Sequence, residues 1–170
     1  MCSDRPLSVL AVDGGGTRCR MALSGALGDH TIEVGPTNLT TYTEEALETL
    51  KGGLQALAES SGHPLHTILA TPAYLGLAGF GDQEEALKRH LGLTQFKAED
   101  DRLAAVRGAL GASDGAIIHA GTGSFLAHQR GGKTRLAGGW GSILGDPGSA
   151  MWFGREVLAR TLDTVDGLRP

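Results

Sequence analysis

The stretch LSVLAVDGGGTRCRMALSG, from Leu7 to Gly25, decides how the chain folds. Its apolar run from Leu7 to Val12 predicts a buried strand, and the run from Met21 to Leu23 predicts the returning strand of a hairpin. A carboxylate and three glycines separate the two strands. Because glycine has no Cβ, such a turn can adopt backbone angles closed to other residues and bring its N–H groups close to a polyanion. A phosphate-binding turn and an ordinary tight hairpin turn both fit this pattern.

The side chains around these glycines favour the phosphate-binding alternative. Thr17 adds a hydroxyl, and Arg18 adds a cation that can face phosphate oxygens. A carboxylate at the end of a buried strand is costly without a cation, so Asp13 is a candidate ligand for hydrated Mg²⁺ beside a phosphate. The alternative for Asp13 is a solvated side chain. The residues expected to contact phosphate or metal here are Asp13, Gly14, Gly15, Gly16, Thr17 and Arg18.

Composition limits the classes of partner. The chain has 170 residues, enough for one domain or for one domain and part of another. Its net charge of −4 and the absence of a basic run give no reason to expect nucleic acid or an anionic membrane as partner. Neither a signal peptide nor an apolar run of membrane length is present, so a cytoplasmic protein is expected. Cys2 and Cys19 have no metal-ligand spacing and form no disulfide framework.

Periodicity predicts an alternation of strands and helices along the rest of the chain. Thr41 and Glu44 have capping-box spacing before an amphipathic helix, whose Gly52 and Gly53 suggest a close packing contact. The expected strands are His30–Gly35, a strand within Ile68–Leu77, Phe96–Ala98, Ala116–Ala120, and a hairpin of Phe125–His128 with Thr134–Ala137. The expected helices are one bearing Ala46 to Ala58, Gln83–Leu91, Asp101 to about Leu110, and one starting at Asp146-Pro147 and running to about Leu162.

A second glycine turn repeats the pattern of the first. The expected buried strand Ala116–Ala120 is followed by Gly121, Thr122, Gly123 and Ser124. Two such turns can hold two ends of one polyphosphate, which makes the pair more informative than either turn alone.

Three polar residues have a structural interpretation, and two of them also have a functional one. Asn38 can bond its own loop or a ligand. Asp101, the last of three consecutive acids, stands at the start of a helix, where such acids supply a cap and favourable helix-dipole charge. Asp146 can be a helix N-cap, an acceptor for a sugar hydroxyl, or both.

Four motifs in order, DGGGT (Asp13 to Thr17), the pair Asp100-Asp101, GTGS (Gly121 to Ser124) and GGWGSILGDPGS (Gly138 to Ser149), resemble the BadF/BadG-type ATPase and N-acetylglucosamine kinase family. That family belongs to the actin-like, hexokinase-like phosphotransferases. The resemblance covers about Leu7 to Gly167. It implies an α/β fold of two ribonuclease-H-like lobes, each a mixed sheet with flanking helices, with ATP and a sugar in the cleft between them.

The resemblance also implies a reaction. Both glycine turns would hold the phosphates of ATP, Asp13 would lie near Mg²⁺, and Asp101 would be the general base for the 6-hydroxyl of N-acetylglucosamine or glucosamine. A non-catalytic sugar- or nucleotide-binding module, and an ATPase of another role, are the alternatives. The positions implied for the sugar are Asn38, Ala78, Gly79, Asp101, Thr122, Gly139 and Asp146.

Departures from the family pattern concern two residues and the length. Pro147 stands where these kinases often have Glu, and Ala78 stands near a serine of the mammalian-type enzymes, which leaves the amino sugar open. No cysteines match the iron–sulfur ligands of the dehydratase-activator branch.

Family members typically continue well beyond this length. We therefore expect residues 1–112 to form the first lobe and 113–170 the beginning of the second. Either a fragment or a short protein that completes itself as a homodimer would fit. An incomplete lobe predicts an exposed apolar stripe on the last helix, formed by Met151, Trp152, Leu158 and Leu162.

Overall fold

The computed structural model describes residues 7–40 and 43–169. The chain forms two compact units, Met1–Ala104 and Ala105–Pro170, and each is described by itself. The division falls within helix α4 (Asp101–Leu110), before the boundary after residue 112 that the sequence suggested. The reason is that Val106, in the second half of α4, is buried with Phe125 and Ala127 of the second unit.

A five-stranded mixed sheet forms the centre of the first unit. The strands are β1 (Val9–Gly14), β2 (Cys19–Ser24), β3 (His30–Val34), β4 (Ala73–Leu77) and β5 (Phe96–Asp100), in the order β3-β2-β1-β4-β5. The first three strands are antiparallel neighbours, whereas β4 is parallel to β1 and β5 is parallel to β4. This arrangement confirms the expected α/β, ribonuclease-H-like fold and the expected opening hairpin.

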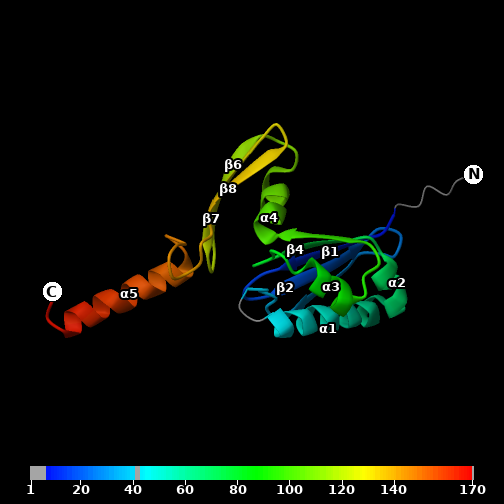
Figure 1. Cartoon of the computed structure of the whole chain (residues 1–170), viewed down its shortest axis with the longest axis horizontal. Helices are drawn as coiled ribbons and strands as arrows, with labels where there is room; N and C mark the ends of the chain where they lie inside the picture. Colours follow the sequence, from blue (N-terminus) through cyan, green and yellow to red (C-terminus); the bar gives the residue numbers. More distant parts are fainter. Residues whose placement is uncertain (1–6, 41–42, 170) are drawn as a thin grey trace, which may run out of the picture. The chain divides into compact units, whose positions relative to one another are not determined.

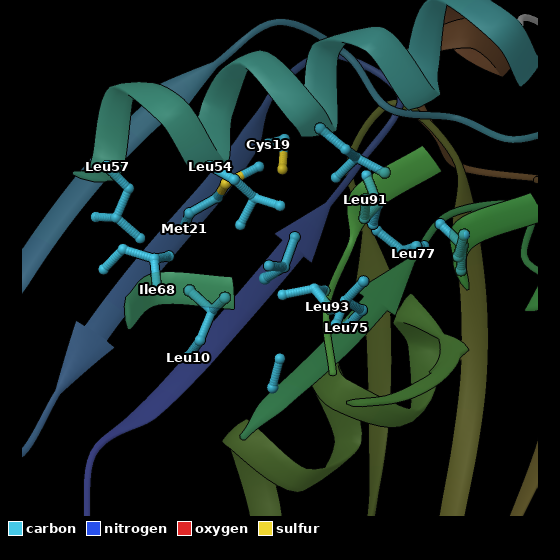
Figure 2. Packing of buried hydrophobic residues seen from close by; sticks show 14 of the residues in the cluster. Leu10, Cys19, Met21, Leu54, Leu57, Ile68, Leu75, Leu77, Leu91 and Leu93 are labelled. Atoms are coloured by element: carbon cyan, nitrogen blue, oxygen red, sulfur yellow. The ribbon is translucent and has the colours of Figure 1, made fainter. Parts of the chain in front are cut away.

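One face of this sheet carries the main hydrophobic core. Buried and exposed residues alternate along β1, because successive side chains of a strand point to opposite faces. Leu10 and Leu75 from the strands pack with Leu54 and Leu57 from the helix above them, as Figure 2 shows. Each such leucine contributes about 1.5–3 kcal/mol of burial free energy.

Three helices cover this face: α1 (Thr43–Ser61), α2 (Leu65–Ala70) and α3 (Glu84–Leu91) (Figure 1). Helices α1 and α3 confirm the sequence predictions. Helix α2 was not predicted, whereas the strand expected within Ile68–Leu77 is confirmed as β4. The β-branched pair Thr67 and Ile68 favours a strand locally, but Ile68 is completely buried in the core as part of a helix that begins after Pro64.

Helix α1 ends in a Schellman motif. Gly62 has a φ of +72°, His63 N–H donates to the Ala58 carbonyl at 3.1 Å, and Gly62 N–H donates to the Glu59 carbonyl at 3.3 Å. The expected capping box at the other end includes Thr41, which lies outside the described residues.

The opposite face of the sheet is contacted by the first turn of α4. That helix begins at Asp101, directly after β5 ends at Asp100, so no loop separates the two elements. Ala104 lies over Gly76 of β4, on the side away from Leu75 and the core.

The second unit contains an antiparallel sheet of β6 (Gly115–Ala120), β7 (Ser124–Arg130) and β8 (Lys133–Gly138). The hairpin of β7 and β8 was expected, and its turn residues Gly131 and Gly132 both have positive φ, as a type I′ turn requires. The prediction that the first of these strands is buried is wrong. Ile118 is 82% exposed, and among the described residues only one side of β6 packs on the small core.

Helix α5 (Ala150–Val165) starts later than the sequence suggested. The prediction of Asp146 as its N-cap is wrong: the N-cap is Ser149, whose hydroxyl accepts a hydrogen bond from Trp152 N–H at 3.1 Å. No described residue of α5 is buried. The expected exposed stripe is confirmed for Met151, Leu158 and Leu162. None of the helices in residues 7–40 and 43–169 has the length and apolarity needed to cross a bilayer.

Candidate active site

Three segments of the first unit meet where β1 and β4 end. The loop after β3 donates from Thr37 N–H to the Gly15 carbonyl at 3.0 Å, and from Leu39 N–H to the Ala78 carbonyl at 3.0 Å. Ala78 N–H in turn donates to the Gly14 carbonyl at 2.7 Å. The glycine turn, the Asn38 loop and the Ala78-Gly79 segment are therefore bonded to one another. Ligand sites of α/β sheets commonly lie at this carboxyl edge.

The glycines of the first turn are needed for space. Gly14, Gly15 and Gly16 are not among the residues with positive φ, so the turn does not use the left-handed backbone angles that glycine allows. A Cβ on Gly14 would collide with the buried Thr37 hydroxyl and lie 2.6 Å from Leu77 Cδ2. Among the described residues other than its chain neighbours, only the Asn38 amide lies within 4 Å of the corresponding point on Gly16. The turn is therefore closely packed at Gly14 and open at Gly16.

Asn38 lies between this turn and Gly79. Its Oδ1 accepts a hydrogen bond from Thr40 N–H at 2.8 Å, which is the local bonding that loop asparagines commonly make. Its Nδ2 lies 3.9 Å from the Cβ point of Gly16. Gly79 has a φ of +72°, and a Cβ there would collide with Thr40 and lie 2.8 Å from Asn38 Oδ1. The structure thus brings together Asn38 and Gly79, as the sequence suggested.

Asp13 is the last residue but one of β1, and it is exposed. The parallel register pairs it with Gly76 of β4. Mg²⁺ in phosphate-transfer sites typically keeps several waters and uses one or two carboxylates, so an exposed aspartate beside a glycine turn fits the ion. Arg18, expected to face phosphate, lies 3.7 Å from Glu33 of β3 and is 64% exposed. No group of three or more metal-ligating side chains occurs in the part of the chain that the structure describes.

Two of the three consecutive acids are engaged by neighbours. Glu99 accepts a hydrogen bond from the Tyr74 hydroxyl and pairs with Lys97 at 2.6 Å. Burial opposes ionisation of Glu99, but these bonds hold its pKa below the ordinary value. Asp100 caps α4 by accepting from Arg102 N–H at 2.9 Å and from the Arg102 side chain at 2.7 and 2.8 Å. Burial opposes ionisation there too, and the Arg102 bonds again keep the pKa low.

Asp101 has different surroundings. Burial, then the charge of Asp100 and a hydrogen bond with it, raise the pKa of Asp101 to about 6. The Cα of Asp101 lies 3.6 Å from the Cβ point of Gly76, the residue that pairs with Asp13. The helix-capping role that the sequence allowed for this acidic cluster therefore belongs to Asp100. Asp101 is a half-buried carboxylate whose pKa is near that of a general base working at neutral pH.

The second unit builds its own cluster around GTGS. Gly121 N–H donates to the Gly123 carbonyl at 2.8 Å, and the Gly121 carbonyl accepts from Ala150 N–H at 2.9 Å. Ser124 donates its hydroxyl hydrogen to the Pro147 carbonyl at 2.9 Å, and its own carbonyl accepts from Gly139 N–H at 3.0 Å. The turn, the end of β8 and the start of α5 are thus tied together, with Thr122 exposed at the tip.

Asp146 is buried within this cluster. It is the only non-glycine residue among those described whose φ is positive, at 56°, and it is 6% exposed. Its Oδ1 accepts from Gly141 N–H at 3.3 Å, and its Oδ2 lies 2.6 Å from the Cβ point of Gly123. A strained, buried aspartate is more typical of a functional site than of a helix cap.

Sequence reasoning gave no role to Thr37. This side chain is completely buried, and its hydroxyl occupies the space that a Cβ on Gly14 would need. The only available signal was its position beside Asn38, because threonine in a loop gives no local indication of burial.

Comparisons with known proteins agree with this arrangement. The sequence profile of the BadF/BadG/BcrA/BcrD ATPase family matches residues 10–170. The chain is 30% identical to the glucosamine kinase GspK of Vibrio cholerae, covering 95% of this chain and 56% of that protein. It is 28% identical to the N-acetylmuramic acid/N-acetylglucosamine kinase of Clostridium acetobutylicum, covering 93% of this chain and 54% of the relative.

A solved structure is also similar. A protein of Chromobacterium violaceum, provisionally assigned as an N-acetylglucosamine kinase, superposes with a TM-score of 0.81 and 27% identity, covering 96% of this chain and 60% of that one. The chain spans about half the length of the curated relatives it matches. Because the family profile matches nearly every residue, and the central sheet has the expected order, the chain belongs to the BadF/BadG/BcrA/BcrD ATPase family.

Proposed function

We propose that this protein transfers a phosphoryl group from ATP to the 6-hydroxyl of an amino sugar, N-acetylglucosamine or glucosamine, with Asp101 as the general base. The observation that carries the proposal is the setting of Asp101, a carboxylate with a raised pKa one strand away from the Asp13 glycine turn. Similarity to amino-sugar kinases supports the substrate class.

The glycine turns would act on phosphate. The space beside Gly16 lets phosphate oxygens approach the backbone of the turn at little steric cost, whereas the Gly15 N–H already donates to the Arg18 carbonyl at 2.9 Å. We extend the proposal to Gly14, Thr17 and Arg18 in this turn and to Gly121, Thr122, Gly123 and Ser124 in the second. Asp13 would hold Mg²⁺ through water or directly. The ion, when bound, neutralises charge on the phosphates.

Asp101 would accept the proton of the attacking hydroxyl. Phosphoryl transfer requires little covalent chemistry from the protein, so positioning and one base are sufficient. The proposed sugar-binding residues supply hydrogen bonds that hold that hydroxyl in line; they are Asn38, Ala78, Gly79, Asp101, Thr122, Gly139 and Asp146.

The test is phosphoryl transfer by the full-length protein. Incubation with ATP, Mg²⁺ and each amino sugar should yield the 6-phosphate, at a rate that rises with pH through about 6 as Asp101 ionises. Asp101→Asn should lower kcat by about 10²–10⁴-fold, the usual contribution of a general base. Asp82→Asn, an exposed acid on the same unit, is the matched control and should leave kcat unchanged. Near-normal turnover by Asp101→Asn would remove Asp101 as the base. Sugar binding in calorimetry without transfer would instead favour a binding module.

A further inference from the structure

Gly76 occupies a crowded position in the middle of the first unit. It lies on β4, where its backbone pairs with Asp13 on one side and with Glu99 on the other. Its φ is not among the positive values, so an ordinary strand conformation does not itself require glycine. Glycine weakens a strand interior and there often marks a close approach of another segment. The reason for glycine at position 76 must therefore be space.

The segment that needs this space is the first turn of α4. A Cβ on Gly76 would lie 2.8 Å from Ala104 Cβ, 3.6 Å from Asp101 Cα and 3.8 Å from the Val12 carbonyl oxygen. Real Cβ atoms essentially never approach another atom within 3.0 Å, and ordinary contact begins at 3.4 Å. A methyl group at position 76 would thus push the turn away from the sheet by about 0.6 Å, the gap between 2.8 and 3.4 Å.

Such a push would act directly on Asp101, because Asp101 is the first residue of α4 and follows β5 without a loop. The bonds between Asp100 and Arg102 tie the end of β5 to the first turn of α4. The helix side has the contact between Ala104 and Gly76. Asp101 lies between these two attachments.

We propose that the contact between Gly76 and Ala104 sets how closely the first turn of α4 packs against β4. Gly76 is therefore a positioning residue for Asp101. The inference rests on the proposed function only in treating Asp101 as the base, because the contact between Gly76 and Ala104 exists whatever reaction the protein performs. Misplacing a reacting group by about 1 Å can cost about 10²-fold in rate, so the Gly76–Ala104 contact should have a measurable effect on the reaction rate.

The test changes the methyl groups on the two sides of the contact. Gly76→Ala adds a methyl group at position 76. The double variant Gly76→Ala/Ala104→Gly keeps that methyl group and removes the Ala104 methyl group with which it would collide. Gly108→Ala is the matched control, because Gly108 lies on the same helix and, in the part of the chain that the structure describes, no atom outside the helix backbone is within 4 Å of its Cβ point. The full chain labelled with ¹³C would be titrated and the carboxyl resonance of Asp101 followed by NMR, with circular dichroism to confirm folding. Asp13, Glu99, Asp100 and Arg102 are the charged groups nearest in sequence or register, and all four are retained in every variant.

In Gly76→Ala, the Asp101 resonance should move and its pKa should fall from about 6 towards the ordinary aspartate value, because the displaced turn exposes the carboxyl to water. The double variant should recover the wild-type titration, and Gly108→Ala should keep it. A folded Gly76→Ala in which Asp101 titrates as in the wild type overturns the proposal. If Gly76→Ala does not fold, Ala104→Gly decides, because it removes the same contact without adding an atom, and an unchanged titration there overturns the proposal.

A kinetic measurement separates this inference from the proposed function. If the wild type transfers phosphate, Gly76→Ala should lower kcat tenfold or more while KM for sugar and ATP stays within twofold, and the double variant should regain most of kcat. If the wild type transfers none, the kinase proposal fails, but the titration still decides whether Gly76 positions Asp101.

Discussion

Three neighbouring acids illustrate how surroundings assign roles that sequence alone leaves open. Glu99 accepts a hydrogen bond from Tyr74 and pairs with Lys97, and Asp100 pairs with Arg102. Both carboxylates therefore stay ionised and have structural roles. Asp101 is the one whose pKa is raised, to about 6. A group with that shift holds its proton more tightly in the folded protein than in the unfolded chain.

That shift makes a prediction about stability. The contribution of protonated Asp101 is fully present below its ordinary pKa of 3.8 and is lost as the pH rises through about 6. Asp101→Asn, which cannot ionise, should therefore be more stable than the wild type at pH 7–8, and the advantage should shrink as the pH falls from 6 to 4. Urea denaturation across this range measures it, with Asp82→Asn as control. A difference that does not change with pH would mean that the pKa of Asp101 is ordinary.

Helix α1 contains two adjacent glycines that have different causes. A Cβ on Gly53 would lie 2.5 Å from Met21 Cε and 2.9 Å from its Sδ, so the helix approaches β2 closely there. Apart from the backbone of α1 itself and the chain neighbours, no atom of the described residues lies within 4 Å of the Cβ point of Gly52. The packing contact that the sequence suggested for both glycines thus exists only at Gly53.

The same substitution should consequently have opposite effects at the two positions. Gly52→Ala should raise the free energy of unfolding by about 1 kcal/mol, the difference in helix propensity between the two residues. Gly53→Ala should lower it by about 1–3 kcal/mol through overpacking against the buried Met21. Urea denaturation of both variants measures the difference. Equal effects would show that Met21 moves aside without cost.

The elements that sequence predicts well are those with a long, regular pattern or a clear stop. The opening hairpin, α1 and the β7–β8 hairpin have such signals in alternation, helical periodicity and glycine turns. The failures have local causes. Six residues are too few to show helical periodicity in α2, and Asp146-Pro147 imitates a helix start that lies at Ser149. For the candidate site, the family resemblance pointed to Asn38, Gly79 and Asp101, whose roles stay predictions, whereas Thr37 and the contact at Gly76 depend on distant segments and have no signal in the sequence.

The two units differ in how much apolar surface they bury. The first has a continuous core from the sheet and three helices. Among the described residues of the second, the buried apolar side chains are Val106, Phe125 and Ala127. Its helix α5 keeps Leu158 and Leu162 more than 60% exposed. Stability is expected to be distributed in the same uneven way, because local opening requires little free energy where few apolar contacts are lost.

Hydrogen exchange of the full chain tests this distribution. Peptides from β1, β4 and α1 should exchange slowly, near the limit set by global unfolding of the first unit. Peptides from α5 should exchange fastest among the helices, because opening it exposes little new apolar surface. Leu158→Ala should leave the exchange of α5 within twofold of the wild type, whereas Leu57→Ala, in the core, should cost about 2–5 kcal/mol and speed exchange throughout the first unit. Strong protection of α5 in the wild type would instead mean that another surface covers its apolar side chains in solution.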